Sequence, residues 1–143
     1  MHFSLFTITL ALAGTTLASP ALLPRADGYC NTDKVVTGVG GYTIHYPALS
    51  SGGSCIMNKG AEGKGVKDLQ TSLNHCYGKS LSVDGDYGDK TKAAVLAAQK
   101  SIGQGLSKDG IWGPATGSKM NWWGSKKVAQ GTETAYSCIK AIL

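Results

Sequence analysis

Apolar side chains recur with helical spacing in two segments of the chain, residues 63–75 and 89–101. Positions three and four residues apart share one face of a helix, so this spacing predicts two amphipathic helices. The apolar faces are formed by Val66, Leu69 and Leu73 in the first segment and by Ala94, Val95, Ala98 and Ile102 in the second. The small alanines of the second helix would let another helix approach closely.

An internal repeat follows the first predicted helix. The pattern Leu-Ser-x-Asp-Gly-x-aromatic-Gly-x-x-Thr begins at Leu81 and recurs 25 residues later, at Leu106. Asp-Gly is a turn dipeptide, because Asp bonds its local backbone and Gly accepts a positive φ. Each copy therefore predicts a turn followed by a helix start. Pro114 suits the first position of a helix, so we expect a short third helix from about Pro114 to about Met120.

The segment before these helices has a different composition. Residues 34–37 and 42–46 are rich in β-forming residues, and a glycine-rich stretch at 38–41 separates them. This arrangement predicts a short hairpin. Taken together, the pattern predicts a mainly α fold: a small three-helix bundle with a short irregular or β N-terminal extension.

The N-terminal residues predict where in or outside the cell the protein is located. Residues 3–13 form an uncharged apolar run followed by small residues, which indicates a signal peptide over residues 1–18; a buried N-terminal strand or helix is the alternative. The run is shorter than the ~20 apolar residues that span a bilayer. Residues 19–25 end in Leu-Pro-Arg, so Arg25 closes either a propeptide or a flexible linker. We therefore expect a secreted, extracellular protein.

Cysteine usage and charge agree with that compartment. The four cysteines, Cys30, Cys55, Cys76 and Cys138, predict two disulfides in a small secreted protein, in any of three pairings. Their scattered positions do not suit a zinc site. The net charge of +5 favours anionic surfaces such as cell walls, although scattered lysines are also what a solvated surface carries.

The helices and the doubled turn together resemble the peptidoglycan-binding domain 1 family. The resemblance covers residues 56–123 and rests on a Gly-Val-Leu-Gln-Leu helix pattern, two Asp-Gly-x-aromatic-Gly-x-x-Thr turns and their spacing. It implies a three-helix module that accompanies cell-wall amidases, muramidases, carboxypeptidases and transpeptidases. It also implies the pairing Cys55–Cys76, which leaves Cys30–Cys138.

The same resemblance divides the chain. Residues 26–54 form an N-terminal extension, and residues 55–123 form the peptidoglycan-binding-like domain. Residues 124–143 form a C-terminal tail that Cys138 ties back.

The sequence offers little for catalysis. His45 and His75 stand in no metal-ligand spacing, Asp84 and Asp109 are explained by turns, and the serines lack a nucleophile elbow. We therefore expect no enzyme activity, no cofactor and no metal. Gln70 and Gln99 are expected to hydrogen-bond the backbone near the turns.

Aromatic side chains are the better candidates for a binding site, because sugars dock on aromatic faces. The candidate ligand-binding residues are Tyr77, Tyr87, Trp112, Trp122 and Trp123. Tyr87 and Trp112 have an alternative role in filling the core between helices. Since adjacent side chains point apart, at least one of Trp122 and Trp123 is expected to be exposed or packed under the N-terminal extension.

These observations favour a non-catalytic secreted protein that binds cell-wall glycan, either peptidoglycan or a related polymer. A secreted effector or inhibitor that binds a protein partner is the alternative, and a small wall hydrolase is a third hypothesis. We expect a monomer without nucleic-acid or membrane partners.

Overall fold

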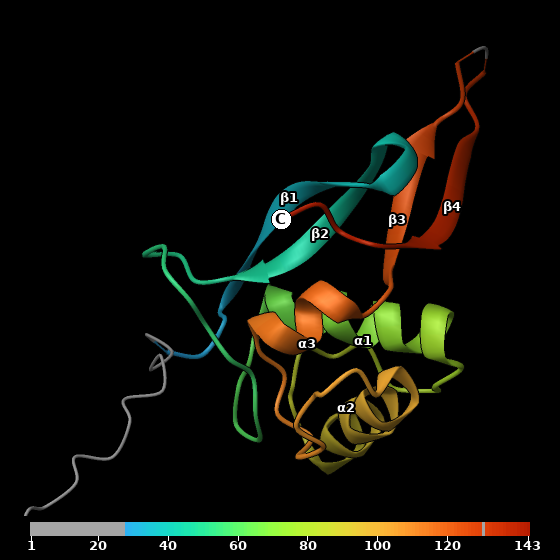
Figure 1. Ribbon diagram of the computed structural model, residues 1–143. Coiled ribbons are helices and arrows are strands. Elements are labelled where there is room, and N and C mark those ends of the chain that lie inside the picture. Colours follow the sequence, from blue (N-terminus) through green and yellow to red (C-terminus); the bar gives the residue numbers. More distant parts are fainter. Residues whose placement is uncertain (1–27, 130) are drawn as a thin grey trace, which may run out of the picture.

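The computed structural model describes residues 28–129 and 131–143 (Figure 1). Two strands come first, β1 (Thr32–Gly38) and β2 (Tyr42–Ala48), joined by a short 3-10 turn (Val39–Gly41). Three helices follow, α1 (Lys64–Tyr77), α2 (Asp89–Ile102) and α3 (Pro114–Lys119). The described chain ends with two further strands, β3 (Trp122–Lys127) and β4 (Thr134–Ile139).

The prediction of a mainly α three-helix bundle is wrong, because the four strands form one antiparallel sheet in the order β1-β2-β3-β4. Residues before and after the helices meet where Thr43 pairs with Ser125 and Ile44 pairs with Gly124. Gly124 allows this close packing, since a Cβ there would lie 2.8 Å from the Ile139 side chain. In Figure 1 the sheet lies on one side of the three helices.

The three helices are confirmed close to their predicted limits, and so is the N-terminal hairpin, with strands longer than expected. Pro114 is the first residue of α3, as its fixed φ favours. Helix α1 is followed by the capping residue Gly78, which adopts the left-handed conformation common at helix C-termini.

The two copies of the repeat have matching hydrogen bonds. The buried Gln70 side-chain amide donates to Asp84 Oδ1, the Asp86 carbonyl and Thr91 Oγ1, and its oxygen accepts from the Gly85 N–H. Gln99 makes the equivalent contacts to Asp109, Ile111, Thr116 and Gly110. The predicted backbone-bonding role of both glutamines is confirmed. Each glutamine ties a turn to the helix that precedes it.

A cluster of aromatic rings joins the sheet to the helices. Tyr46 of β2 packs against Trp112 and Trp122, with ring centroids 5.6 and 4.8 Å apart. The same cluster reaches Gly117 of α3, where a Cβ would lie 2.1 Å from the Tyr46 hydroxyl. The sheet and the helices therefore share one core.

The predicted disulfide pairing is wrong, because the bridges are Cys30–Cys55 and Cys76–Cys138. The chain around Cys30 runs beside the segment that follows Cys55, where the Cys30 N–H donates to the Ile56 carbonyl at 3.0 Å. Cys138 pairs with Trp123 in the sheet, which brings it to the C-terminal end of α1 and to Cys76. Cys138 lies on the sheet, which is the part of the fold that the helical resemblance does not include.

The signal-peptide and propeptide predictions, residues 1–18 and 19–25, lie outside the described residues. Within residues 28–129 and 131–143, no helix combines the length and the apolar character needed to cross a membrane.

Candidate functional site

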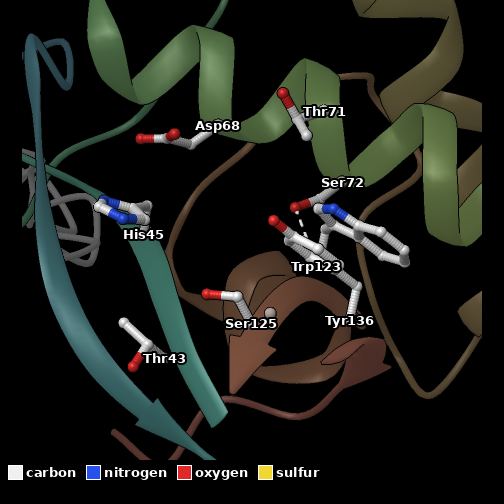
Figure 2. A pocket seen from close by; sticks show the side chains of 9 residues that line it. Thr43, His45, Asp68, Thr71, Ser72, Trp123, Ser125 and Tyr136 are labelled. Carbon is white, nitrogen blue, oxygen red and sulfur yellow. Dashed lines mark hydrogen bonds between the residues drawn. The ribbon is translucent and has the colours of Figure 1, made fainter. Parts of the chain in front are cut away.

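A groove runs between helix α1 and strands β2, β3 and β4 (Figure 2). Its volume is about 260 Å³. Helix and sheet side chains of hydroxyl, imidazole, carboxylate and aromatic type line it: Thr43, His45, Asp68, Thr71, Ser72, Trp123, Ser125 and Tyr136, with the backbone of Gly124.

Local strand and helix geometry explains this lining. In β2, Thr43 and His45 alternate with the buried Ile44 and Tyr46, so the polar residues share one face of the sheet. A hydrogen bond connects the two walls of the groove, since the Trp123 N–H of β3 donates to Ser72 Oγ of α1 at 3.1 Å.

Stacked aromatic rings form one end of the groove. Trp123 stacks on His75, with ring centroids 4.2 Å apart, and on Tyr136, with centroids 5.4 Å apart; both pairs are within 10° of parallel. Tyr136 remains 57% exposed. This stack presents a rigid aromatic surface, which is the feature that binds the apolar face of a sugar ring.

Titratable groups form the other end. His45 Nδ1 lies 2.5 Å from Asp33 Oδ2, and Lys64 Nζ lies 2.8 Å from Asp33 Oδ1. Hydrogen bonds from Lys64 and His45 outweigh the effect of burial and lower the pKa of Asp33. Burial, reinforced by the Asp33 charge, raises the pKa of Asp68 to about 6. The carboxyl group of Asp33 is thus held ionised, whereas that of Asp68 resists ionisation.

A shallower basic surface continues from the groove along β3. It shares Thr43, Ser125 and Tyr136 with the groove and adds Lys126 and Lys127. The Lys126 ammonium donates to the Gly40 carbonyl at 2.7 Å, whereas Lys127 is exposed. The combined surface therefore has a carboxylate end and an ammonium end, with aromatic rings beside it.

The structure places the five predicted aromatic residues in different environments. Tyr87, Trp112 and Trp122 are at most 1% exposed and belong to the core. Their polar atoms are satisfied there: Tyr87 donates to the Gly110 carbonyl, Trp112 donates to Met120 Sδ, and Trp122 donates to the Gly117 carbonyl. Tyr77 is half-buried, with its hydroxyl oxygen accepting from the Asn121 N–H at 2.7 Å. Trp123 alone of the five lines the groove.

Sequence reasoning missed His45, Asp68 and Tyr136 as parts of one site. Each belongs to a different element, so no short motif connects them. The signal that was available is the polar alternation of Thr43 and His45 in the predicted hairpin, because a polar strand face that packs toward a helix lines a groove rather than a core.

Two further hollows lie at the Asp-Gly turns, beside Gln70 and beside Gln99. Both have volumes of about 270 Å³. Each lining includes the glutamine with an aspartate and a threonine of the turn, and neither includes an aromatic ring. The groove is therefore the stronger candidate for binding a sugar.

The protein so described is a small α+β protein with two disulfides and an aromatic-lined groove beside its sheet. Residues 62–120 match the sequence model of a family described as "Putative peptidoglycan binding domain". The predicted family resemblance is confirmed for these residues, which match the family's sequence model.

Curated relatives agree with this assignment. The chain is 46% identical over 70 residues to a probable N-acetylmuramoyl-L-alanine amidase of Bacillus licheniformis, which is 47% of this chain and 19% of that protein. It is 39% identical over 69 residues to a zinc D-Ala-D-Ala carboxypeptidase of Streptomyces albus G, which is 47% of this chain and 26% of that protein. An uncharacterized protein of Kitasatospora aureofaciens is 39% identical over 88 residues, which is 61% of this chain and 66% of that protein.

The chain thus spans about a fifth to a quarter of the length of the amidase and carboxypeptidase relatives. No solved structure matches it significantly.

Proposed function

We propose that this protein is an extracellular, non-catalytic module that binds cell-wall glycan in the groove between α1 and the sheet. Among such glycans, peptidoglycan is the favoured ligand. The proposal rests on the exposed ring of Tyr136, which stacks on Trp123, which in turn stacks on His75. A pyranose ring would stack on Tyr136, and the hydroxyl side chains of the groove would bond its hydroxyl groups.

The charges at the two ends of the surface suit a glycan that carries peptides. Peptidoglycan stems contain free carboxylates, which the exposed Lys127 would attract. Diamino-acid side chains in the stems contain an ammonium group, which Asp68 would attract when it is ionised. An uncharged glycan offers neither partner, so this arrangement favours peptidoglycan over a neutral polymer.

An extracellular location is part of the proposal. The two disulfides fit it, because such bridges persist in oxidising compartments. The peptidoglycan-binding domain fits it as well, since the wall lies outside the cell membrane.

The proposal of binding without catalysis rests on the cysteines, which are all in disulfides, and on the extent of the match to known enzymes. All four cysteines are in disulfides, so none is a thiolate nucleophile. The matched amidase and carboxypeptidase sequences extend far beyond the segment shared with this chain, so their names describe more protein than the shared domain.

A sedimentation assay with insoluble peptidoglycan tests the proposal. We expect the wild-type protein to pellet with the wall material, and Tyr136→Ala to weaken binding at least about fivefold, which corresponds to ~1 kcal/mol of lost stacking. The matched control is Tyr29→Ala, because Tyr29 is another exposed tyrosine (43%) that does not line the groove.

Equal binding by the two variants would overturn the assignment of the groove. Absence of sedimentation by the wild-type protein would overturn wall binding itself. A chitin pellet in parallel distinguishes a charged, peptide-bearing glycan from a neutral one.

A further inference from the structure

We propose that Asp33, His45 and Asp68 form a binding site for one divalent transition-metal ion, with Zn²⁺ as the best-fitting ion, at one end of the groove. The spacing of these residues in the sequence gave no reason to expect a metal. The site is created by the tertiary fold.

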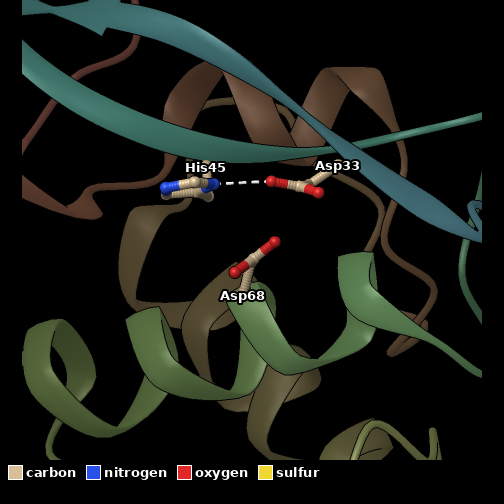
Figure 3. A group of neighbouring side chains, drawn as sticks. All are labelled: Asp33, His45 and Asp68. Atoms are coloured by element: carbon tan, nitrogen blue, oxygen red, sulfur yellow. Dashed lines mark hydrogen bonds and ion pairs between the residues drawn. The ribbon is translucent and has the colours of Figure 1, made fainter.

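The three side chains converge from three elements (Figure 3). Asp33 of β1 and His45 of β2 lie side by side on the hairpin, and Asp68 of α1 points toward them from the helix. One ligand atom from each residue lies within 4.8 Å of the other two. A zinc ion with bonds of about 2.0–2.2 Å to nitrogen and oxygen needs its ligand atoms roughly 3–3.5 Å apart, so small side-chain rotations suffice.

Asp68 supplies an independent indication of a missing partner. Its Oδ2 atom is buried and has no hydrogen-bond partner among the described residues. A buried carboxylate oxygen without a donor is costly, and native structures rarely leave one. Because the neighbouring carboxylate of Asp33 also repels it, a cation is the kind of partner that would satisfy this atom.

The existing contacts of Asp33 leave room for the ion. Lys64 binds Oδ1, whereas Oδ2 faces His45. Lys64 is 61% exposed, so it can keep its contact with Oδ1 at the rim while Oδ2 binds the ion. The short contact between Oδ2 and His45 Nδ1 would open as both atoms bind the metal, with the imidazole proton on Nε2.

The ligand set selects the class of metal. An imidazole nitrogen with two carboxylates suits Zn²⁺ and similar transition ions, whereas Mg²⁺ and Ca²⁺ prefer oxygen ligands alone. Three protein ligands leave a coordination position for water or for an oxygen of a bound molecule. His45 and Asp68 both line the groove, so that position would face it.

Isothermal titration calorimetry with ZnCl₂ on the full chain, stripped of metal by a chelator, tests the site. The expected result is one ion per chain, with MgCl₂ and CaCl₂ failing to compete. We expect His45→Gln and Asp68→Asn each to weaken Zn²⁺ binding roughly tenfold or more, since even outer-shell changes at metal sites cost this much. His75→Gln is the matched control, because it removes another imidazole outside the cluster.

Thermal unfolding keeps the test interpretable. Bound Zn²⁺ is expected to raise the Tm of the wild-type protein and of His75→Gln, and to leave the two site variants nearly unchanged. Without metal, Asp68→Asn is expected to unfold at or above the wild-type temperature, because it removes a buried unpaired carboxylate. If Asp68→Asn fails to fold, His45→Gln, whose side chain is 49% exposed, carries the comparison.

Equal Zn²⁺ affinity in the wild-type protein and the site variants would overturn the proposal, and so would the absence of one-to-one binding. The readout uses the metal alone, so failure of this site and failure of wall binding are distinguishable.

Discussion

The two buried glutamines that bond to the repeated turns allow a quantitative test of how the domain is held together. Replacing Gln99 by Leu keeps the size of the side chain but removes its amide. In the native protein that amide donates to the Ile111 carbonyl at 2.8 Å and accepts from the Gly110 N–H at 2.9 Å. Gln70 makes the equivalent bonds in the first copy, to the Asp86 carbonyl and the Gly85 N–H, both at 3.0 Å.

The magnitude follows from the groups left without partners. Each substitution strands at least one backbone N–H and one carbonyl in or near the core, and each such group costs about 1–3 kcal/mol. Gln99→Leu and Gln70→Leu are therefore each expected to lower the free energy of unfolding by roughly 3–4 kcal/mol. That is a large part of the ~5–15 kcal/mol typical of a domain.

Guanidinium denaturation followed by tryptophan fluorescence measures both variants. Lys100→Leu is the matched control, because it introduces the same side chain at an exposed position next to Gln99 in α2; we expect it to change stability by less than about 0.5 kcal/mol. A loss below about 1 kcal/mol in both glutamine variants would refute the role assigned to the turns.

Two further stability predictions concern the disulfides and the turn glycines. Removing the Cys76–Cys138 bridge, with a sequence separation of 62, is expected to cost about 4.3 kcal/mol, and removing the Cys30–Cys55 bridge, with a separation of 25, about 3.5 kcal/mol. Chemical denaturation of the paired Cys→Ser variants measures this order, and peptide mapping that found any other pairing would contradict the structure. Gly110→Ala is expected to cost about 2 kcal/mol or more, because φ is +69° and the new Cβ would lie 2.8 Å from the Lys92 carbonyl oxygen. Gly105→Ala, at φ +70° with nothing within 4 Å, is expected to cost only the ~1–2 kcal/mol of backbone strain; equal losses at the two glycines would show that crowding at Gly110 is absent.

The helices and the turns could be predicted from the sequence because their signals are local. The spacing of Val66, Leu69 and Leu73 defines one helix face, and Asp-Gly followed by Pro114 defines a turn and a helix start. The role of Gln99 followed from its match to the helix pattern of the family. In each case the residues that interact lie within about 25 positions of one another.

The sheet could not be predicted in full, because its central pairing joins Thr43 to Ser125. Strand β3 also combines two tryptophans, a glycine and two lysines, which is a weak strand signal. The expected C-terminal tail is thus half of a sheet. The groove depends on that sheet, so its lining was predicted only at Trp123, and no sequence pattern distinguished Tyr136 on β4.

The buried aromatics illustrate the same limit. Trp122 and Trp123 are adjacent and point to opposite faces of β3, as expected for neighbours in a strand. The sequence predicts that at least one of them is exposed or packed under the N-terminal extension, but it does not say which. The ring of Tyr46 packs on Trp122, and this contact across the sheet buries Trp122 and leaves Trp123 at the groove.

NMR titration of the isotope-labelled protein with soluble peptidoglycan fragments shows directly whether wall glycan binds in the groove beside the sheet. Binding in the groove is expected to shift the backbone amide signals of Thr43, Ser125 and Tyr136 saturably, with little change at the Asp-Gly turns. Saturable shifts confined to the turn hollows around Asp84 and Asp109, or no saturable shift anywhere, would contradict it.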